Sequence, residues 1–222
     1  MNIPVEPFIL SFKLAAWTTL LMLPIGFLLA RLLAWGRFRG RAWLEAAVAL
    51  PLVLPPTVLG YYLLVALSPQ SAVGAFFADI FGQALAFSFP GLVVASMVFN
   101  LPFAVQPMQQ AFAAIPHEVR EAAWVSGLST GRTIRVVELP LAWPGVLGAA
   151  VLTFAHTLGE FGVVLMVGGN IPGETQTAAI AIYDQVQSFE MEAAAAASSV
   201  LLVFAMVAIV LVRTLANRSA MR

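Results

Sequence analysis

Five apolar stretches, each long enough to cross a lipid bilayer, constrain this chain more than any other feature of its sequence. A helix needs about 20 mostly apolar residues to span the hydrocarbon core. The stretches cover residues 8–33, 46–67, 87–114, 141–167 and 193–212. The second and third carry no charged residue, and the fourth is interrupted by His156 and Glu160. The sequence therefore predicts an all-α polytopic membrane protein that forms one transmembrane domain over residues 1–222.

The composition supports this class and excludes several others. Hydrophobic residues make up 61% of the 222 residues and charged residues 10%, against roughly 45–50% and about 25% in soluble domains. The net charge is zero, which gives no reason to expect a nucleic-acid partner. The chain has no cysteine, so disulfides, thiolate metal sites and thiol catalysis are excluded, and two histidines make a poor metal site. We expect no cofactor and no metal.

The basic residues indicate how the chain is oriented. With five spans, ten of the eleven fall on one side of the membrane: Arg31, Arg37, Arg39, Arg41, Arg120, Arg132, Arg135, Arg213, Arg218 and Arg222. Only Lys13 falls on the other side. Because cytoplasmic loops carry the excess of Lys and Arg, this distribution predicts an N-terminus outside and a C-terminus in the cytoplasm. An even number of spans would break the pattern.

Prolines and glycines recur inside the predicted spans. They are Pro24, Gly26, Pro51, Pro55, Pro56, Gly60, Pro90, Pro102 and Pro107. Such residues are tolerated in membrane helices where neighbouring helices or water satisfy the freed backbone groups. Two interpretations stay open: ordinary kinks in packed helices, or broken helices that line a pathway.

The longest predicted cytoplasmic loop, residues 113–140, is expected to form a compact hairpin of two short helices. Residues 117–125 are good helix formers, and Gly127 can supply a left-handed stop after them. The second helix is expected to end at Pro140, where the fourth span begins. A short, rigid unit of this kind is suited to transmitting force.

Seven residues of this loop fall at a fixed spacing: Glu121, Ala122, Ala123, Gly127, Val137, Leu139 and Pro140. The spacing resembles the EAA loop of ABC importer permeases, in which Glu-Ala-Ala is followed by Gly and then by Ile-x-Leu-Pro. Val137 in place of Ile is the one departure. The resemblance implies a type I ABC importer permease fold, and it implies that the loop docks in a groove on a cytoplasmic ATPase subunit.

Three further segments narrow the resemblance to molybdate permeases. Residues 51–64, Pro-Leu-Val-Leu-Pro-Pro-Thr-Val-Leu-Gly-Tyr-Tyr-Leu-Leu, resemble the second-span signature of these permeases. Residues 158–162, Leu-Gly-Glu-Phe-Gly, resemble an element shared with sulfate and thiosulfate permeases. Residues 170–175, Asn-Ile-Pro-Gly-Glu-Thr, favour molybdate. Nothing in these segments separates molybdate from tungstate.

The resemblance also implies the partners and the mechanism. It implies a homodimer in the bacterial inner membrane, with two cytoplasmic ATPase subunits and an extracytoplasmic molybdate-binding protein. Transport would proceed by alternating access, driven by ATP. The chain has no GxxxxGK[ST] motif, so the energy must come from a partner, and we expect a transport subunit and not an enzyme.

Four polar residues of the fourth span share one helical face. Thr153, His156, Thr157 and Glu160 are spaced i, i+3, i+4 and i+7. Polar and charged residues within a membrane tend to face a cavity or a partner. We hypothesise that they line the translocation path, with the threonine hydroxyls and a protonated His156 solvating the dianion. Glu160 is assigned either to a pairing with His156 or to an outer gate, and Asn170 is added as a path or gate residue.

Alternatives remain for the function and for two segments. The polar face of the fourth span is also compatible with a satisfied contact between helices. The outer segment 175–189 is either a re-entrant or interfacial helix or a surface helix packed on the spans. The rival functions are a sulfate, thiosulfate or tungstate permease, and an ion-coupled secondary transporter that uses Glu160 and His156 as a proton relay. An intramembrane enzyme is disfavoured because the spans contain no nucleophile–base pair.

Overall fold

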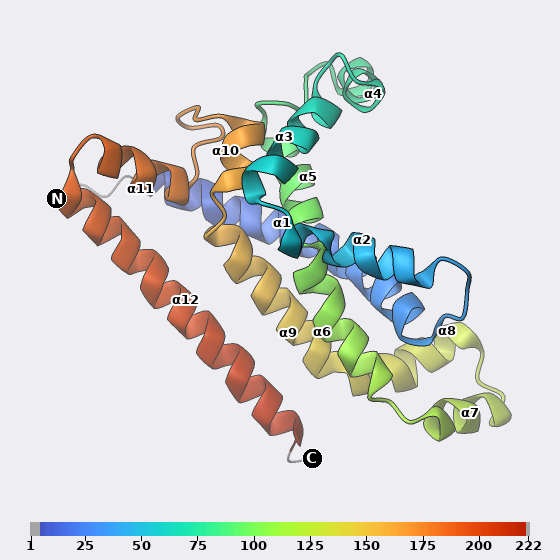
Figure 1. Cartoon of the computed structure of the whole chain (residues 1–222). Helices are drawn as coiled ribbons and strands as arrows, with labels where there is room; N and C mark the ends of the chain where they lie inside the picture. The colour runs from blue at the N-terminus through green and yellow to red at the C-terminus, as the bar shows by residue number, and fades with distance from the viewer. Residues whose placement is uncertain (1–4, 221–222) are drawn as a thin grey trace.

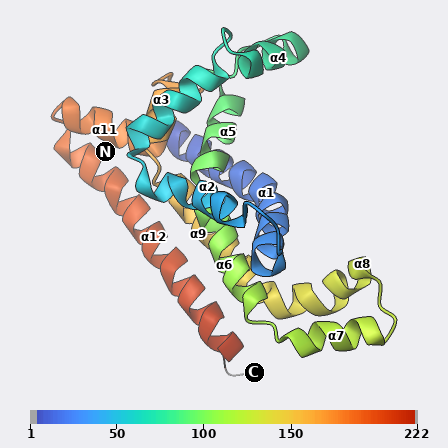
Figure 2. The same ribbon diagram turned by 45° about the vertical axis from the view of Figure 1, so that its right-hand side comes forward.

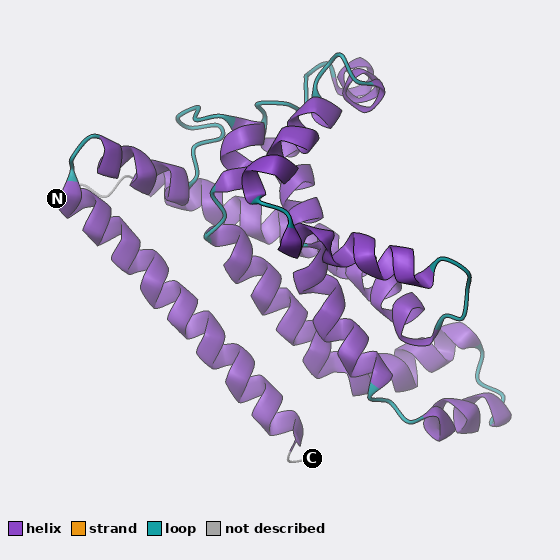
Figure 3. Cartoon of the chain, viewed as in Figure 1, coloured by secondary structure: helices purple, strands orange, loops and turns teal. Residues whose placement is uncertain are grey.

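Helices account for all the regular secondary structure of residues 5–220, the part of the chain that the computed structural model describes (Figure 3). In chain order they are α1 (Val5–Trp35), α2 (Arg41–Val53), α3 (Pro56–Leu67), α4 (Ala72–Phe81), α5 (Phe89–Phe99), α6 (Leu101–Ala113), α7 (His117–Val125), α8 (Thr130–Thr133), the π-helical turn η1 (Ile134–Glu138), α9 (Leu139–Leu158), α10 (Gly162–Gly168), α11 (Ala178–Gln187) and α12 (Met191–Ala220). The all-α prediction is confirmed.

Three helical segments are long and apolar enough to cross a membrane alone. They are Val5–Trp35, Thr130–Leu158 and Met191–Leu211. Two bent pairs pass the same criteria only when their members are taken together: α2 with α3, and α5 with α6. The described residues therefore provide from three to five candidate membrane spans, and five are reached when each bent pair is counted as one span.

The second apolar stretch is broken at two consecutive prolines. α2 and α3 meet at an angle of 114°, where a single straight helix over 46–67 would have none. Leu54 precedes Pro55, and both residues adopt extended backbone angles, with ψ of 138° and 134°. A proline disfavours the helical conformation of the residue before it. Two successive prolines therefore force the chain out of the helix, and at this site the prolines form a break and not a mild kink.

The third stretch bends less sharply, by 43° at Asn100. Pro102 follows in the first turn of α6, where its missing N–H is tolerated. The side-chain amide of Asn100 donates to the carbonyl of Ser96 at 2.8 Å. The bend thus turns a buried polar side chain toward the interior of the molecule.

The fourth span begins earlier and ends earlier than the sequence predicts. The helix that starts at Thr130 continues through Pro140, so the prediction that the second hairpin helix ends there is wrong. The π-helical turn η1 absorbs the proline: the amide of Leu139 donates to Ile134, five residues back, and the register shifts just before Pro140. The helix then stops at Leu158, and residues 159–161 separate it from the short helix α10.

The core sits between α1, α6 and α9, which pack closely on one another. Met22, Ala104, Met108, Phe112 and Ala149 are among its buried side chains. α12 lies along one side of the bundle and packs on α9 and α11 (Figure 1). The outer segment forms α11, which packs on α1 and α12, with Ile180 fully buried.

The two ends of the bundle carry different elements. The α7–α8 hairpin and the end of α12 lie at one end, whereas α4, α10 and α11 lie at the other (Figures 1 and 2). The start of α1 is beside α11, so the first and last helices place their free ends at opposite ends of the molecule (Figure 1). Of the arginines used to predict orientation, Arg222 lies outside the described residues.

Candidate functional site

The seven residues of the predicted loop motif lie on a hairpin that projects from the bundle (Figure 2). The first helix, α7, ends in a Schellman motif. The amide of Gly127 donates to Trp124 at 2.9 Å, and the amide of Leu128 donates to Ala123 at 3.1 Å. Gly127 has a φ of +80°, and a Cβ there would meet nothing within 4 Å. The left-handed stop predicted for Gly127 is present, and the glycine is required by its backbone conformation.

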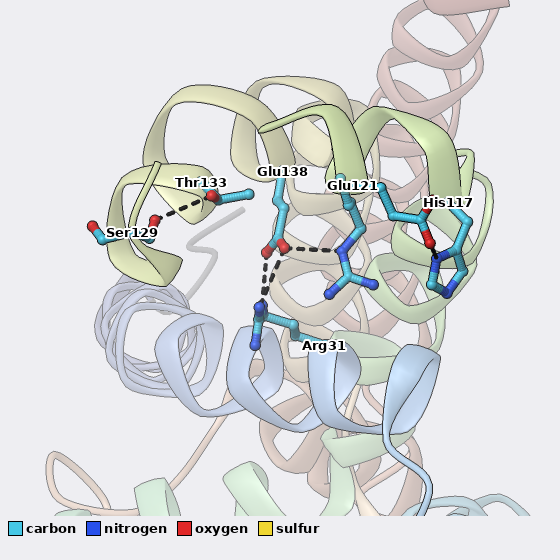
Figure 4. A network of polar contacts seen from close by, with 7 residues as sticks. Arg31, His117, Glu121, Ser129, Thr133 and Glu138 are labelled. Carbon is cyan, nitrogen blue, oxygen red and sulfur yellow. Dashed lines mark hydrogen bonds and ion pairs between the residues drawn. The ribbon is translucent and has the colours of Figure 1, made fainter. Parts of the chain in front are cut away.

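The outer surface of α7 has little else packed on it. Glu121 and Ala122 are exposed, Ala123 is turned inward, and Val125 is 89% exposed. The Oε1 of Glu121 lies 3.5 Å from Nδ1 of His117 in an exposed pair (Figure 4). Val137 and Leu139 are half-buried in the continuous helix beside α7, and Pro140 is exposed there. The hairpin therefore presents a small apolar tip with acidic and basic groups around it.

A buried carboxylate that sequence reasoning missed anchors this hairpin. Glu138 is fully buried at the end of η1, and both of its oxygens are engaged. Arg31 of α1 donates from Nε to Oε2 at 2.7 Å, and Arg120 of α7 donates from Nε to Oε1 at 3.2 Å (Figure 4). In the loop motif Glu138 occupies the unspecified position between Val137 and Leu139, so the motif gives it no role. A lone acidic residue next to an apolar span is the signal that marks it.

A second polar cluster lies at the other end of α9. Thr153, His156 and Thr157 lie on the helix, and Glu160 follows two residues after its end. Thr153, Thr157 and Glu160 are buried, at 0%, 2% and 4% exposure. The hydroxyl of Thr157 donates to the carbonyl of Thr153 at 2.7 Å, whereas the hydroxyl of Thr153 has no hydrogen-bond partner. The four predicted residues are thus brought close together along one end of α9.

The partners of this cluster come from α5 and from the α5–α6 bend. Ser96 donates to Oε2 of Glu160 at 3.0 Å, and Oε1 of Glu160 has no hydrogen-bond partner. Nδ1 of His156 lies 3.0 Å from Oδ1 of Asn100, and the imidazole stacks on Phe103 at 3.9 Å between ring centroids. Each of the two titratable residues therefore has its own partner, and the His156–Glu160 pairing considered above is not formed. Ser96 and Asn100 were missed, although two polar residues at i and i+4 in an uncharged span could have indicated them.

Two recesses border this cluster. The first has a volume of about 600 Å³ and is lined by Pro56, Thr57, Phe99, Ala155, His156, Gly159, Glu160, Phe161 and Gly162. The second has a volume of about 260 Å³ and is lined by Leu52, Pro102, Phe103, Gln106, Pro107, Gln110 and Leu152. His156 lines the first recess, and Phe103, whose ring stacks on it, lines the second. Leu52 of α2 lines the second recess, and Pro56 and Thr57 of α3 line the first. This favours the interpretation of a broken helix that lines a pathway.

Asn170 lies in the loop after α10. Its Nδ2 donates to Oδ2 of Asp184 on α11 at 2.6 Å, and Gln176 donates to the same oxygen at 3.1 Å. These bonds tie the outer loop to α11. The hydrogen bond of Asn170 thus goes to α11 and not to the four polar residues around the end of α9.

Comparison with known proteins identifies relatives along nearly the whole chain. The family described as binding-protein-dependent transport system inner membrane component matches residues 22–220. The chain is 49% identical over 181 residues to the molybdenum transport system permease protein ModB of Azotobacter vinelandii, covering 82% of this chain and 80% of that protein. It is 36% identical over 215 residues to ModB of Escherichia coli strain K12, covering 96% and 94%. It is 32% identical over 197 residues to the sulfate transport system permease protein CysT of Salmonella typhimurium, covering 89% and 71%.

Solved structures share the fold at lower sequence identity. A bacterial alginate ABC transporter in complex with its alginate pentasaccharide-bound periplasmic protein matches with a TM-score of 0.76 at 19% identity, covering 98% of this chain and 80% of that chain. The MetNI methionine ABC transporter in an inward-facing conformation matches with a TM-score of 0.62 at 20% identity, covering 95% and 93%. The arrangement of helices described above is therefore one found in ABC importers.

Proposed function

This chain belongs to the family of binding-protein-dependent transport system inner membrane components, and from that premise we propose that it is the membrane-spanning permease subunit of an ATP-driven molybdate importer. The observation that carries the proposal is the likeness to a molybdenum permease at 49% identity over 82% of the chain. The sulfate permease is a more distant relative, at 32% identity. The chain is a multi-pass inner-membrane protein and a transport subunit, and ATP hydrolysis belongs to a separate partner.

The topology proposed is five crossings, with the N-terminus outside and the C-terminus in the cytoplasm. Each bent pair, α2 with α3 and α5 with α6, then counts as one crossing. The opposite placement of the start of α1 and the end of α12 supports an odd count (Figure 1). The arginines near the hairpin and in the α1–α2 connection support a cytoplasmic position for that end of the molecule.

The projecting hairpin is proposed to dock on a cytoplasmic ATPase subunit. Val125 is 89% exposed and Trp124 is 43% exposed, so the tip offers an exposed apolar surface. Glu121 lies at its rim, where a charged group contributes to specificity and orientation. The residues of this coupling hairpin are Glu121, Ala122, Ala123, Gly127, Val137, Leu139 and Pro140.

The translocation path is proposed to run along the two recesses beside α9. Glu160 lines the first recess, and among the described residues one of its buried oxygens has no hydrogen-bond partner, so it is free to bind water or a passing group. The stacked rings of Phe103 and His156 separate the recesses and suit a constriction. Glu160 and Asn170 are assigned to the outer gate. Two copies of the chain, related by a twofold axis, would enclose the path between them.

The complete transporter is proposed to contain two copies of this chain, two ATPase subunits and an extracytoplasmic molybdate-binding protein. ATP binding closes the ATPase pair, moves the hairpins and opens the path outward. Hydrolysis returns the path to the inward-facing state. The permease then needs only weak contacts with the oxyanion, because the binding protein captures it.

Uptake by vesicles that hold the complete transporter tests this proposal. We expect ATP-dependent molybdate import that excess sulfate leaves unchanged and that excess tungstate inhibits. Competition by sulfate would favour the sulfate permease. Import by the chain alone, abolished by an uncoupler and indifferent to ATP, would favour the ion-coupled transporter and overturn the proposal.

The path assignment has its own test in His156→Leu. We expect molybdate uptake to fall at least tenfold while assembly and ATP hydrolysis persist, because the polar ring between the recesses is lost. Trp143→Leu is the matched control, since Trp143 is an aromatic residue of the same helix that lines neither recess. Unchanged uptake in the histidine variant would reject the path assignment.

A further inference from the structure

The hairpin is joined to the bundle by one buried ion cluster that links three elements. Glu138 contributes a side chain with 0% exposure, and its partners Arg31 and Arg120 have side-chain exposures of 24% and 7%. Arg31 belongs to α1, Arg120 to α7, and Glu138 is the last residue before α9. A single carboxylate thus holds the hairpin, the end of α1 and the start of α9 together (Figure 4).

Arg120 makes a second attachment between the hairpin and α1. Its guanidinium lies 3.6 Å from the ring centroid of Trp35, a distance at which cation–π attraction is strong. Trp35 in turn contacts the ring of Phe112 at 5.2 Å between centroids, at the end of α6. The orientation of α7 is therefore fixed by Arg120 through both a salt bridge and an aromatic stack.

The cluster lies at a weak point of the fourth span. The π-helical turn η1 occupies residues 134–138, directly before α9 and Pro140. Such turns interrupt the regular hydrogen-bond ladder and are frequent at functional sites. We call this π-helical turn the joint. Without a side-chain contact across it, the hairpin could rotate at the joint while α9 kept its orientation. Glu138 bridges the joint at its last residue.

Beyond the joint, α9 is one continuous helix, with Pro144 inside it, and its far end carries the path residues. It has 20 residues, so it is about 30 Å long at 1.5 Å per residue. Glu138 directly precedes its first residue, and Glu160 follows its last residue by two. If Glu138 rotates or shifts together with α9, the far end of the helix moves with it, and the recess at His156 and Glu160 changes shape.

We propose that Glu138 is a positioning residue that clamps α7, α1 and α9 into one body, so that motion of the hairpin is transmitted to the path and not lost at the π-helical joint. This inference rests on the proposed function. A buried ion cluster adds little net stability compared with apolar packing, but it requires one geometry. Its role here is to fix the orientation of the hairpin.

The test compares Glu138→Gln and Arg120→Lys in the assembled transporter. The first keeps the shape of the side chain and removes its charge, and the second keeps the charge and removes the planar fork. We expect ATP hydrolysis to stay within about twofold of wild type, while molybdate transported per ATP falls at least tenfold in Glu138→Gln and severalfold in Arg120→Lys. A merely structural role would lower the yield of complex and leave this ratio unchanged.

Glu45→Gln is the matched control. Glu45 accepts from Arg41 at 3.0 Å in an exposed i,i+4 pair near the same end of the molecule. The same chemical change is thus made in a salt bridge within one helix, which does not hold separate elements together. We expect wild-type coupling in this variant. A wild-type ratio in both Glu138→Gln and Arg120→Lys would overturn the clamp.

A second measurement needs no substrate. The chain has no cysteine, so Glu118→Cys accepts a single nitroxide label at an exposed position in the first turn of α7, away from the docking tip at Trp124 and Val125. We expect Glu138→Gln to raise the mobile fraction of the label at least twofold, and Glu45→Gln to leave it unchanged. Equal spectra in all three backgrounds would overturn the clamp even if molybdate proved not to be the substrate. If Glu138→Gln does not assemble, Arg120→Lys decides by the same two measurements.

Discussion

Two buried carboxylates flank the same helix and have opposite surroundings. Glu138, before α9, has both oxygens engaged by arginines. Glu160, after α9, accepts one hydrogen bond from Ser96 and leaves its other oxygen without a partner beside a recess of about 600 Å³. A glutamate therefore fixes the orientation of neighbouring helices at one end of α9, whereas at the other end a glutamate keeps one oxygen able to accept a further hydrogen bond. Burial alone does not separate these roles, whereas the number of satisfied oxygens does.

Removing the satisfied carboxylate is the strongest way to test this contrast. Glu138→Ala leaves Arg31 and Arg120 without their counter-charge, and breaking a buried pair in this way costs about 3–5 kcal/mol. Because Arg31 is partly exposed, we expect a loss near about 3 kcal/mol in the free energy of unfolding, measured by denaturation in detergent micelles.

The matched change at the other end is Glu160→Ala. It removes the hydrogen bond from Ser96, but it also removes a buried carboxyl oxygen that has no partner among the described residues, and the second change offsets the first, so we expect a net loss of no more than about 1 kcal/mol. Equal losses in the two variants would show that the number of satisfied oxygens does not distinguish the two ends of α9.

The next prediction concerns α9, the helix between Glu138 and Glu160. Gly145 lies where α9 packs on α6, and a Cβ there would be 2.4 Å from the Cβ of Ala111 and 2.8 Å from the carbonyl oxygen of Pro107. The added methyl group would have to displace the backbone of α6 at Pro107, and this costs free energy, so we expect Gly145→Ala to destabilise the protein by about 1–3 kcal/mol. In Gly148→Ala a Cβ meets nothing within 4 Å, and the helix propensity of alanine should make this control neutral or stabilising by up to about 1 kcal/mol. Thermal unfolding of the two variants separates these outcomes, and a Gly145→Ala as stable as Gly148→Ala would contradict the close packing.

The sequence predicted the apolar helices well because hydrophobic length is a local property. The first and fifth stretches each became one long helix, and the left-handed turn at Gly127 was correctly predicted from the glycine alone. The apolar helix α4 was not predicted. Its exposed Val73, Phe76 and Ile80 lie at i, i+3 and i+7, but its ten residues are too few to span a membrane, so hydrophobic length did not indicate it.

Interactions between distant segments were beyond sequence reasoning. Arg31 and Glu138 are 107 positions apart, and Ser96 and Glu160 are 64 apart. The face shared by Thr153, His156 and Thr157 followed from helical spacing, whereas the prediction that Glu160 continues that face is wrong, because α9 ends at Leu158. The residues that contact the cluster depended on how α5 packs. The π-helical turn also had no local signal, because a proline after a short polar segment usually indicates the start of a new helix.

The free oxygen of Glu160 provides the third prediction. Glu160→Gln keeps the shape and the hydrogen bond from Ser96, and it replaces a carboxyl that can ionise by an amide that cannot, at the wall of the first recess. Because a carboxyl in its ionised form repels a dianion and the amide has no such form, we expect ATP-independent downhill flux of molybdate to rise by up to about tenfold, equivalent to about 1.4 kcal/mol. Flux is measured in vesicles without ATP, with Glu174→Gln as the control at an exposed outer position. Equal flux in the two variants would remove Glu160 from the gate.

The smallest effect is expected where a carboxylate is neither buried nor clamped. Glu45 and Arg41 form a 3.0 Å pair, and both side chains are 40% exposed. Exposed i,i+4 pairs contribute about 0.3–0.5 kcal/mol, and salt screens them. Glu45→Gln should therefore change the free energy of unfolding by no more than that, and 0.5 M salt should remove the difference, whereas the loss caused by Glu138→Ala should persist in salt because its charges are largely shielded from solvent. A salt-sensitive loss at Glu138, or a large loss at Glu45, would mean that exposure does not set the strength of these pairs.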